Sequence, residues 1–346
     1  MALSQQGATR HSLLINLGGG MVTDLGGFAA ATFKRGISYI NIPTTLLAMV
    51  DASVGGKTGI NFNGLKNEIG SFAPADSVLI ETEFLRSLDA QNFFSGYAEM
   101  LKHGLISNTA HWVELLDFNT NNIDYAYLKN MVGRSVQVKE DIVEQDPFER
   151  GIRKALNLGH TAGHAFESLA LAENRPVLHG YAVAWGIVCE LYLSHLKVGF
   201  PKDKMRQTIQ FIKENYGSFA FDCKQYEQLY AFMQHDKKNT SGTVNFTLLK
   251  EIGDICINQT ADKDTILKCL TSIANVWESD LETYYNNEGE WDSLKWFPIS
   301  SFPFPFSSPT YAFIPHRHLL YYPKLLIRYW DNDIPVCFLK KRPKDD

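Results

Sequence analysis

Three short apolar runs alternate with glycine-rich turns and helical patterns, and this alternation constrains the first 90 residues more than any other feature of the chain. The runs are SLLINL (12–17), SYINIP (38–43) and SVLIE (77–81). Between them, MVTDLGGFAAATFKRG and TTLLAMVDASVGG have turn residues and helical apolar spacing. Strands that alternate with helices are typical of a parallel sheet with helices on its faces. We therefore expect an α/β domain over residues 1–90.

From about residue 91 onward, apolar residues recur at the spacing of an α-helix. Helical candidates are AQNFFSGYAEMLKHGLISN, AYLKNMVGRSVQVKEDIVEQD, LGHTAGHAFESLALAE and GYAVAWGIVCELYLSHLKVG. A hairpin-like segment, TVNFTLLKEIGDICIN, and a last helix, KDTILKCLTSIAN, follow them. We expect a second, mostly α-helical domain over residues 91–275.

The tail over residues 276–346 differs from the rest of the chain in composition. It is rich in proline and aromatic residues, and WFPISSFPFPFSSPTYAFIP has neither the helical nor the strand period. No fold follows from this pattern. The tail is either an added partner-binding segment or out-of-frame translation, and the lack of periodicity favours the second.

Composition and charge exclude several classes of protein. The chain has 45% hydrophobic and 21% charged residues and a net charge of −5, a profile of globular proteins rather than disordered or nucleic-acid-binding ones. No apolar run reaches the roughly 18 residues of a membrane span, and the N-terminus lacks a signal-peptide pattern. The five cysteines are scattered and include no CxxC pair, which indicates free thiols. We expect a cytoplasmic protein without a membrane or nucleic-acid partner.

A glycine turn joins the first predicted strand to the first predicted helix in NLGGGMVTDLGG. Such a turn exposes backbone N–H groups to a phosphate, and the helix dipole favours the negative charge. The turn is therefore a candidate dinucleotide site. It is not the usual GxGxxG, however, so a plain tight turn stays open as an alternative.

Polar side chains gather in the glycine-rich stretch VDASVGGKTGINFNGLKNEIG, which we expect to form loops. The lysines of this stretch supply ammonium groups for a phosphate or carboxylate, although a solvated surface loop is the simpler interpretation. Its candidate residues are Asp51, Lys57, Lys66 and Asn67.

A candidate metal site combines an acidic helix with three histidines. SGYAEMLKHGLI places Glu99 in a helix with an apolar face, where a carboxylate costs desolvation unless a cation meets it. His160 and His164 lie one helical turn apart, and His179 follows. Zinc sites often combine two histidines with one carboxylate, so Glu99 with any two of the histidines would suffice. The spacing alone permits both His160 and His164 on one metal, and hydrogen-bonded structural histidines remain the alternative.

Five segments resemble, in order and spacing, the signatures of the 3-dehydroquinate synthases of the sugar-phosphate cyclase family. They are GGGMVTDLGGFAAATFKRGI, IPTTLLAMVDASVGGKTGIN, GYAEMLKHGLI, LNLGHTAGHAFE and LHGYAVAWG, and the resemblance covers about residues 5–275. It implies conversion of 3-deoxy-D-arabino-heptulosonate 7-phosphate to 3-dehydroquinate and phosphate. It also implies NAD, one divalent metal (zinc or cobalt) and a homodimer. The first domain would then bind the dinucleotide, and the second would bind the metal and the phosphorylated sugar acid.

The resemblance assigns roles position by position. Metal ligands would be Glu99, His160 and His179, which leaves His164 at the substrate. The other catalytic positions would be Lys57, Lys102, Asn157, Arg153, Asp51 and Lys139.

Within this set, Lys57, Asn157 and His164 would hold the phosphate. Asp51, Lys102 and Lys139 would contact ring hydroxyls. The partners of the substrate carboxylate would be Arg153 and either Lys237 or Lys238.

The NAD positions implied by the resemblance fall in the first domain. They are Gly19, Gly20, Asp24, Thr44 and Thr45, with Lys66 and Asn67 on further matching positions. Glu149 also matches a family position, and Arg35 would reach the substrate phosphate of a neighbouring subunit.

Two other functions stay open. A metal-dependent polyol dehydrogenase shares the architecture, but an uncharged polyol needs no group of cations such as Lys57, Lys102, Lys139 and Arg153. An inactive remnant that binds only metal is the second.

The chain begins only a few residues before SLLINL, so we expect an incomplete, N-terminally truncated dinucleotide-binding domain with an exposed apolar edge and weak NAD binding.

Overall fold

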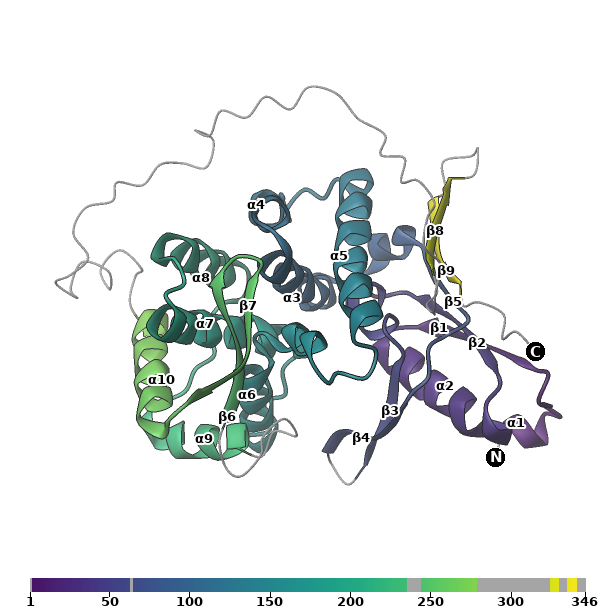
Figure 1. The fold of residues 1–346 in the computed structure, drawn as a ribbon, viewed down its shortest axis with the longest axis horizontal. Coiled ribbons are helices and arrows are strands. Elements are labelled where there is room, and N and C mark those ends of the chain that lie inside the picture. The colour runs from purple at the N-terminus through teal and green to yellow at the C-terminus, as the bar shows by residue number, and fades with distance from the viewer. Residues whose placement is uncertain (1, 63–64, 235–243, 279–323, 330–334, 341–346) are drawn as a thin grey trace.

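The computed structural model describes residues 2–62, 65–234, 244–278, 324–329 and 335–340. Figure 1 shows the N-terminal strands at one end of the molecule and a group of helices at the other, with further helices between them. Within the described residues, no helix combines the length and the apolar character that crossing a membrane requires.

The N-terminal strands form the expected parallel sheet. β1 (Leu13–Gly18) pairs in parallel with β2 (Ser38–Pro43), which pairs in parallel with β5 (Ser77–Ile80). Helix α2 (Gly20–Thr32) begins directly after β1 and packs against β1 and β2. The glycine turn therefore lies at the carboxyl end of a parallel strand, the edge at which open α/β sheets bind ligands.

The stretch expected to be glycine-rich loop is instead a hairpin, so that expectation was wrong. β3 (Lys57–Phe62) pairs antiparallel with β4 (Leu65–Phe72). In β3, the β-branched residues Thr58 and Ile60 on either side of Gly59 fit a pleated strand. The helix expected before it is short: η2 spans only Ala48–Ala52.

The remainder of the chain up to residue 278 is mostly helical, as predicted. Only one hairpin, β6 (Val244–Glu251) with β7 (Asp254–Ala261), interrupts the described helices of this part. α3 and α5 lie between the N-terminal sheet and the group α6–α10 (Figure 1). The bounds are α3 (Ala90–Ser107), α4 (Thr109–Asp117), α5 (Tyr125–Gln145), η4 (Ile152–Asn157), α6 (His160–Ala172), α7 (His179–Val198), α8 (Lys202–Tyr216), α9 (Tyr226–Gln234) and α10 (Lys263–Glu278).

Two segments of the tail form strands, although the sequence pattern predicted no fold there. β8 (Lys324–Tyr329) and β9 (Pro335–Lys340) pair antiparallel, and β9 extends the sheet beyond β5 in the order β1-β2-β5-β9-β8. KLLIRY and PVCFLK are short apolar runs separated by WDNDI, a pattern that fits a hairpin. The rest of the tail, on which the choice between an added segment and out-of-frame translation depends, lies outside the described residues.

One face of β1 is open to solvent. Leu13, Ile15 and Leu17 alternate along the strand and are 50%, 56% and 58% exposed. Strands of parallel sheets are usually covered on both faces. These apolar side chains lie on the edge strand of the described five-stranded sheet.

Candidate active site

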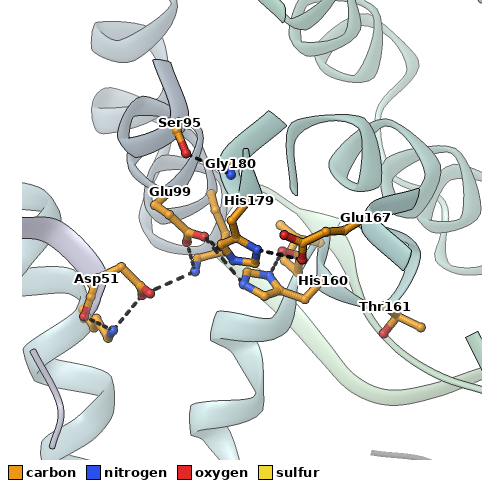
Figure 2. Close-up of polar contacts among 12 residues, drawn as sticks. Asp51, Ser95, Glu99, His160, Thr161, Glu167, His179 and Gly180 are labelled. Carbon is orange, nitrogen blue, oxygen red and sulfur yellow. Dashed lines mark hydrogen bonds and ion pairs between the residues drawn. The ribbon is translucent and has the colours of Figure 1, made fainter. Parts of the chain in front are cut away.

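Five side chains from four elements converge where the N-terminal sheet meets the helices. Glu99 and Lys102 come from the middle of α3, Asp51 from η2, His160 from the first residue of α6 and His179 from the first residue of α7. In Figure 2, Glu99, His160 and His179 point toward one another, with Asp51 on one side of them. The three predicted metal ligands and two of the predicted catalytic residues, Asp51 and Lys102, thus lie in one cluster.

A close helix contact places His179 beside Glu99. The backbone N–H of Gly180 donates to Ser95 Oγ of α3 over 3.1 Å. A Cβ at position 180 would lie 1.9 Å from the Ser95 carbonyl oxygen, so only glycine permits the start of α7 to lie so close to α3.

The donor atoms of Glu99, His160 and His179 fit a divalent metal. Glu99 Oε1 lies 3.6 Å from His160 Nε2 and 3.7 Å from His179 Nε2, and the three donor atoms lie within 4.8 Å of one another. Glu99 is fully buried, and its Oε1 has no hydrogen-bond partner among the described residues. A buried carboxylate oxygen facing two imidazole nitrogens suits a cation, since one carboxylate and two histidines are a common zinc set.

His164 belongs to the same cluster of rings but not to this donor group. Its ring centroid lies 5.4 Å from that of His160 and 5.8 Å from that of His179. The helical spacing left open whether the His160–His164 pair shares a metal. The geometry instead groups His160 with His179 and supports a separate task for His164.

The second oxygen of Glu99 is bound by an ammonium group. Lys102 Nζ donates to Glu99 Oε2 and lies 3.9 Å from Asp51 Oδ1, and Lys102 is only 1% exposed. Asp51, Glu99 and His103 form a second group whose donor atoms lie close enough for a metal. Because Lys102 contacts both carboxylates, the positive charge there already comes from the protein. The group with His160 and His179 is the better candidate metal centre.

Asp51 is held as an ionised carboxylate. Lys139 of α5 contacts Asp51 Oδ1 at 2.6 Å and the Asp51 carbonyl at 2.5 Å. Desolvation raises the pKa of Asp51, but Lys139 and Lys102 outweigh it, and the pKa lies well below its usual range. Burial lowers the pKa of Lys139, and Asp51 opposes that effect. Asp51 is thus available as a hydrogen-bond acceptor for a substrate hydroxyl.

Two residues predicted to hold phosphate meet on a carboxylate. Lys57 Nζ lies 2.5 Å from Glu149 Oε2, and Asn157 Nδ2 donates to Glu149 Oε1 over 2.9 Å. Glu149 has a φ of 58°, a left-handed conformation that costs free energy for a residue other than glycine. The Lys57–Glu149 pair joins β3 to the loop before η4.

Arg153 is engaged by main-chain oxygens rather than open to solvent. It is 1% exposed, and its guanidinium donates to the carbonyls of Pro147 at 2.6 Å and Gly55 at 2.8 Å. The Asp146 carboxylate accepts backbone N–H bonds from Arg150, Gly151 and Arg153 and so closes this loop. The structure places Arg153 next to the site but with its terminal nitrogens occupied.

Four of the predicted NAD residues, Gly19, Gly20, Thr44 and Thr45, follow the carboxyl ends of β1 and β2. The Thr44 N–H donates to the Gly18 carbonyl over 3.0 Å, which brings the second strand's end to the glycine turn and its Gly19 and Gly20. Asp24, one turn into α2, has its pKa raised to about 7 by burial and by Asp51, an effect that Lys139 partly offsets.

The remaining predicted residues are one exposed arginine and four residues whose side chains the structure does not describe. Arg35 is exposed beyond the far end of α2. Lys66 and Asn67 lie on β4, but their side chains are outside the described residues, as are Lys237 and Lys238 altogether.

Sequence reasoning missed Glu167, which contacts a predicted metal ligand. Its Oε2 lies 3.5 Å from His179 Nδ1 (Figure 2). A carboxylate on the second ring nitrogen fixes the orientation of a ligating histidine. Glu167 follows His160 by seven residues on α6, so the shared helix face was the signal that could have indicated it.

Comparison with known proteins gives a consistent result. The family model described as 3-dehydroquinate synthase N-terminal matches residues 1–95, and the model described as 3-dehydroquinate synthase C-terminal matches residues 96–239. A 3-dehydroquinate synthase of Parabacteroides distasonis is 62% identical over 269 residues, which are 78% of this chain and 76% of the relative.

Solved structures of sugar-phosphate cyclases share the fold. A 2-deoxy-scyllo-inosose synthase complexed with carbaglucose-6-phosphate, NAD+ and Co2+ has a TM-score of 0.69 at 23% identity, with 79% of this chain and 76% of that chain covered. A 2-epi-5-epi-valiolone synthase from Streptomyces hygroscopicus with NAD+ and Zn2+ bound has a TM-score of 0.68 at 25% identity, with 79% and 77% covered.

Proposed function

The chain belongs to the 3-dehydroquinate synthase family, and from this membership we propose how its own residues carry out the conversion of 3-deoxy-D-arabino-heptulosonate 7-phosphate to 3-dehydroquinate and phosphate. One observation carries the proposal. The donor group Glu99–His160–His179 lies directly beside the Asp51–Lys102 contact, so the metal-binding set and the hydroxyl-binding set are joined through the Lys102–Glu99 pair.

Glu99, His160 and His179 would hold one divalent metal, and the lack of a hydrogen-bond partner for Glu99 Oε1 among the described residues supports this assignment. Bound there, a metal supplies Lewis-acid polarisation of a substrate hydroxyl. The glycine turn after β1, with Gly19 and Gly20, would receive NAD, whose hydride chemistry belongs to the cofactor. The two cyclases with NAD+ and Co2+ or Zn2+ bound support both groups, and zinc and cobalt are equally compatible with the donor set.

Oxidation of one substrate hydroxyl to a ketone acidifies the neighbouring C–H, which allows phosphate to leave before the carbonyl is reduced again and the ring closes. The protein's task in this sequence is to position the substrate and compensate its charge. Ionised Asp51 would accept a hydrogen bond from a ring hydroxyl, and Lys102 and Lys139 would donate to ring oxygens. Their contacts with Asp51 hold all three groups in place before the substrate binds.

The anionic ends of the substrate would meet the remaining cations. Lys57, Asn157 and His164 would hold the phosphate, a role supported by the carboxylate that Lys57 and Asn157 already bind. Arg153 would meet the substrate carboxylate once its guanidinium turns from the main-chain oxygens. A lysine at 237 or 238 would assist it. The buried lysines argue against a polyol dehydrogenase, because an uncharged polyol has no anion to balance.

The finer assignments are part of the same proposal. The cofactor set would include Asp24, Thr44, Thr45, Lys66 and Asn67. The enzyme would be a cytoplasmic homodimer in which Arg35 reaches the phosphate of the neighbouring subunit's substrate. Its first domain would span residues 1–90 and its second residues 91–275.

Phosphate release tests the function. Purified chain is mixed with the heptulosonate phosphate, NAD and zinc, beside a Lys57→Ala variant. Release by the wild-type chain that disappears in the variant supports the proposal. No release from a folded, metal-loaded wild-type chain would show that the chain is an inactive relative of the family.

A further inference from the structure

Helix α6, which begins with His160, receives its N-terminal cap from another helix. The N-cap residue is Gly159, which has no side chain that could accept a hydrogen bond from the first turn of the helix. The backbone N–H groups of Gly159, Thr161 and Ala162 instead donate to the carboxylate of Glu190 on α7, over 2.7, 3.0 and 3.3 Å.

The environment of Glu190 fits an ionised cap. Glu190 is fully buried, and a buried carboxylate is costly unless hydrogen bonds and positive potential compensate it. Three backbone N–H groups provide the bonds, and the N-terminal end of α6 provides the potential of the helix dipole. Removing these contacts would leave the first-turn N–H groups of α6 buried without partners, which is unfavourable.

The capped turn carries a predicted metal ligand. His160 lies between Gly159 and Thr161, which both donate to Glu190. The same helix, α7, begins with His179. One helix therefore positions His179 directly and His160 through Glu190, and the two imidazoles end 3.6 and 3.7 Å from Glu99 Oε1.

We propose that Glu190 is a positioning residue of the metal centre. Its carboxylate fixes the first turn of α6 relative to α7, so that His160 and His179 face Glu99 together. This inference rests on the metal site of the proposed function, but it concerns the geometry of the ligands and not the reaction. Outer-shell partners of this kind typically change metal affinity about 10- to 100-fold when they are altered.

Cobalt binding tests the inference without any activity measurement. Co2+ is titrated into the wild-type chain and into Glu190→Gln, an isosteric change that places an N–H2 group against the backbone donors. We expect about 10-fold weaker Co2+ binding or more, together with a changed visible absorption spectrum, while far-UV circular dichroism stays the same. Ser194→Ala is the matched control, because Ser194 is also buried on α7 and its hydroxyl bonds the main-chain carbonyl of Glu190 and the N–H of Leu249 rather than α6.

A second variant covers the case in which Glu190→Gln does not fold. Glu190→Asp keeps the charge but shortens the side chain by one methylene, so it cannot reach all three N–H groups, and it should also weaken Co2+ binding and shift the spectrum. Wild-type affinity and spectrum in the folded variants overturn the inference, and so does a wild-type chain that binds no Co2+. A chain that shows the expected Glu190 effects but releases no phosphate would reject the proposed function alone.

Discussion

Replacing Glu149 by glutamine should make the ligand-free chain bind inorganic phosphate more tightly. The Glu149 carboxylate joins Lys57 and Asn157, two of the groups that we propose for the substrate phosphate. In the absence of substrate it thus acts as an internal competitor for that site. A phosphate must break both contacts before it can bind there.

The contacts set the size of the effect. The Lys57 side chain is 51% exposed and that of Glu149 24%, so solvent screens their ion pair, and such pairs are worth about 0.2–1 kcal/mol. The hydrogen bond from Asn157 adds roughly 0.5–1.5 kcal/mol. Glutamine at position 149 keeps one acceptor oxygen, so the substitution removes only part of the free energy of these two contacts. We expect a gain of about 1–2 kcal/mol, or roughly 5- to 30-fold tighter binding.

Isothermal titration with inorganic phosphate measures the change directly. Glu83→Gln is the control for net charge, since Glu83 is an exposed residue paired with Arg86. Lys57→Ala combined with Glu149→Gln should bind phosphate weakly, because the cation is then absent. Equal or weaker phosphate binding by Glu149→Gln than by the wild-type chain would refute the view that Glu149 competes for the phosphate site.

Three further predictions concern metal, pH and packing. Zinc at about 100 times its dissociation constant should stabilise the folded chain by about 2.7 kcal/mol, which is measured as a rise in Tm. This zinc-induced rise should be absent in His179→Ala and present in His195→Ala. An equal rise in both variants would contradict the proposed ligands. Burial, followed by neighbouring acidic groups, raises the pKa of Glu140 to about 8. The free energy of unfolding therefore falls between about pH 4.5 and pH 8, because the folded state keeps a proton that the unfolded chain has already released. Glu140→Gln should therefore raise Tm relative to the wild-type chain at pH 8 but not at pH 4, and a pH-independent difference would contradict this. Gly186→Ala would place a Cβ 1.9 Å from the Gly159 carbonyl oxygen and should lower the free energy of unfolding by about 3 kcal/mol; an unchanged urea midpoint would show that the two helices can separate without cost.

Local patterns in the sequence predicted the elements that carry the site. Apolar runs and turn residues located β1, β2 and β5, and helical spacing located α3, α6 and α7. The β3–β4 hairpin was missed because its many glycines look like loop residues, whereas pairing with a neighbouring strand decides their conformation. Two strands of the tail were missed for a similar reason, since each is short and flanked by aperiodic sequence.

The site itself depends on contacts between residues far apart in the chain. A spacing of four residues allows His160 and His164 to share a metal, and only the packing of α7 on α3 brings His179 to Glu99 instead. The Lys57–Glu149 pair spans 92 residues, so no local pattern predicts it.

Carboxylates in apolar helices were likewise ambiguous. Glu190 lies in a helix that is buried along most of its length, and the sequence did not show which backbone donors it would meet. The proposed positioning role of Glu190 follows only from the packing of α7 against the start of α6, which places Gly159 beside it.

The middle of α3 has a consequence for how this chain can be improved. Glu99, Lys102 and His103 are almost completely removed from solvent in a helix whose other buried side chains are mostly apolar. Well-packed apolar residues in place of a buried ion pair are often neutral or stabilising by about 1–4 kcal/mol. Selection for heat resistance alone would therefore tend to replace Glu99 and Lys102 and remove the ligand on which the metal centre depends. Stability and activity are opposed at this helix, so a more robust form of the protein should be sought at surface positions instead.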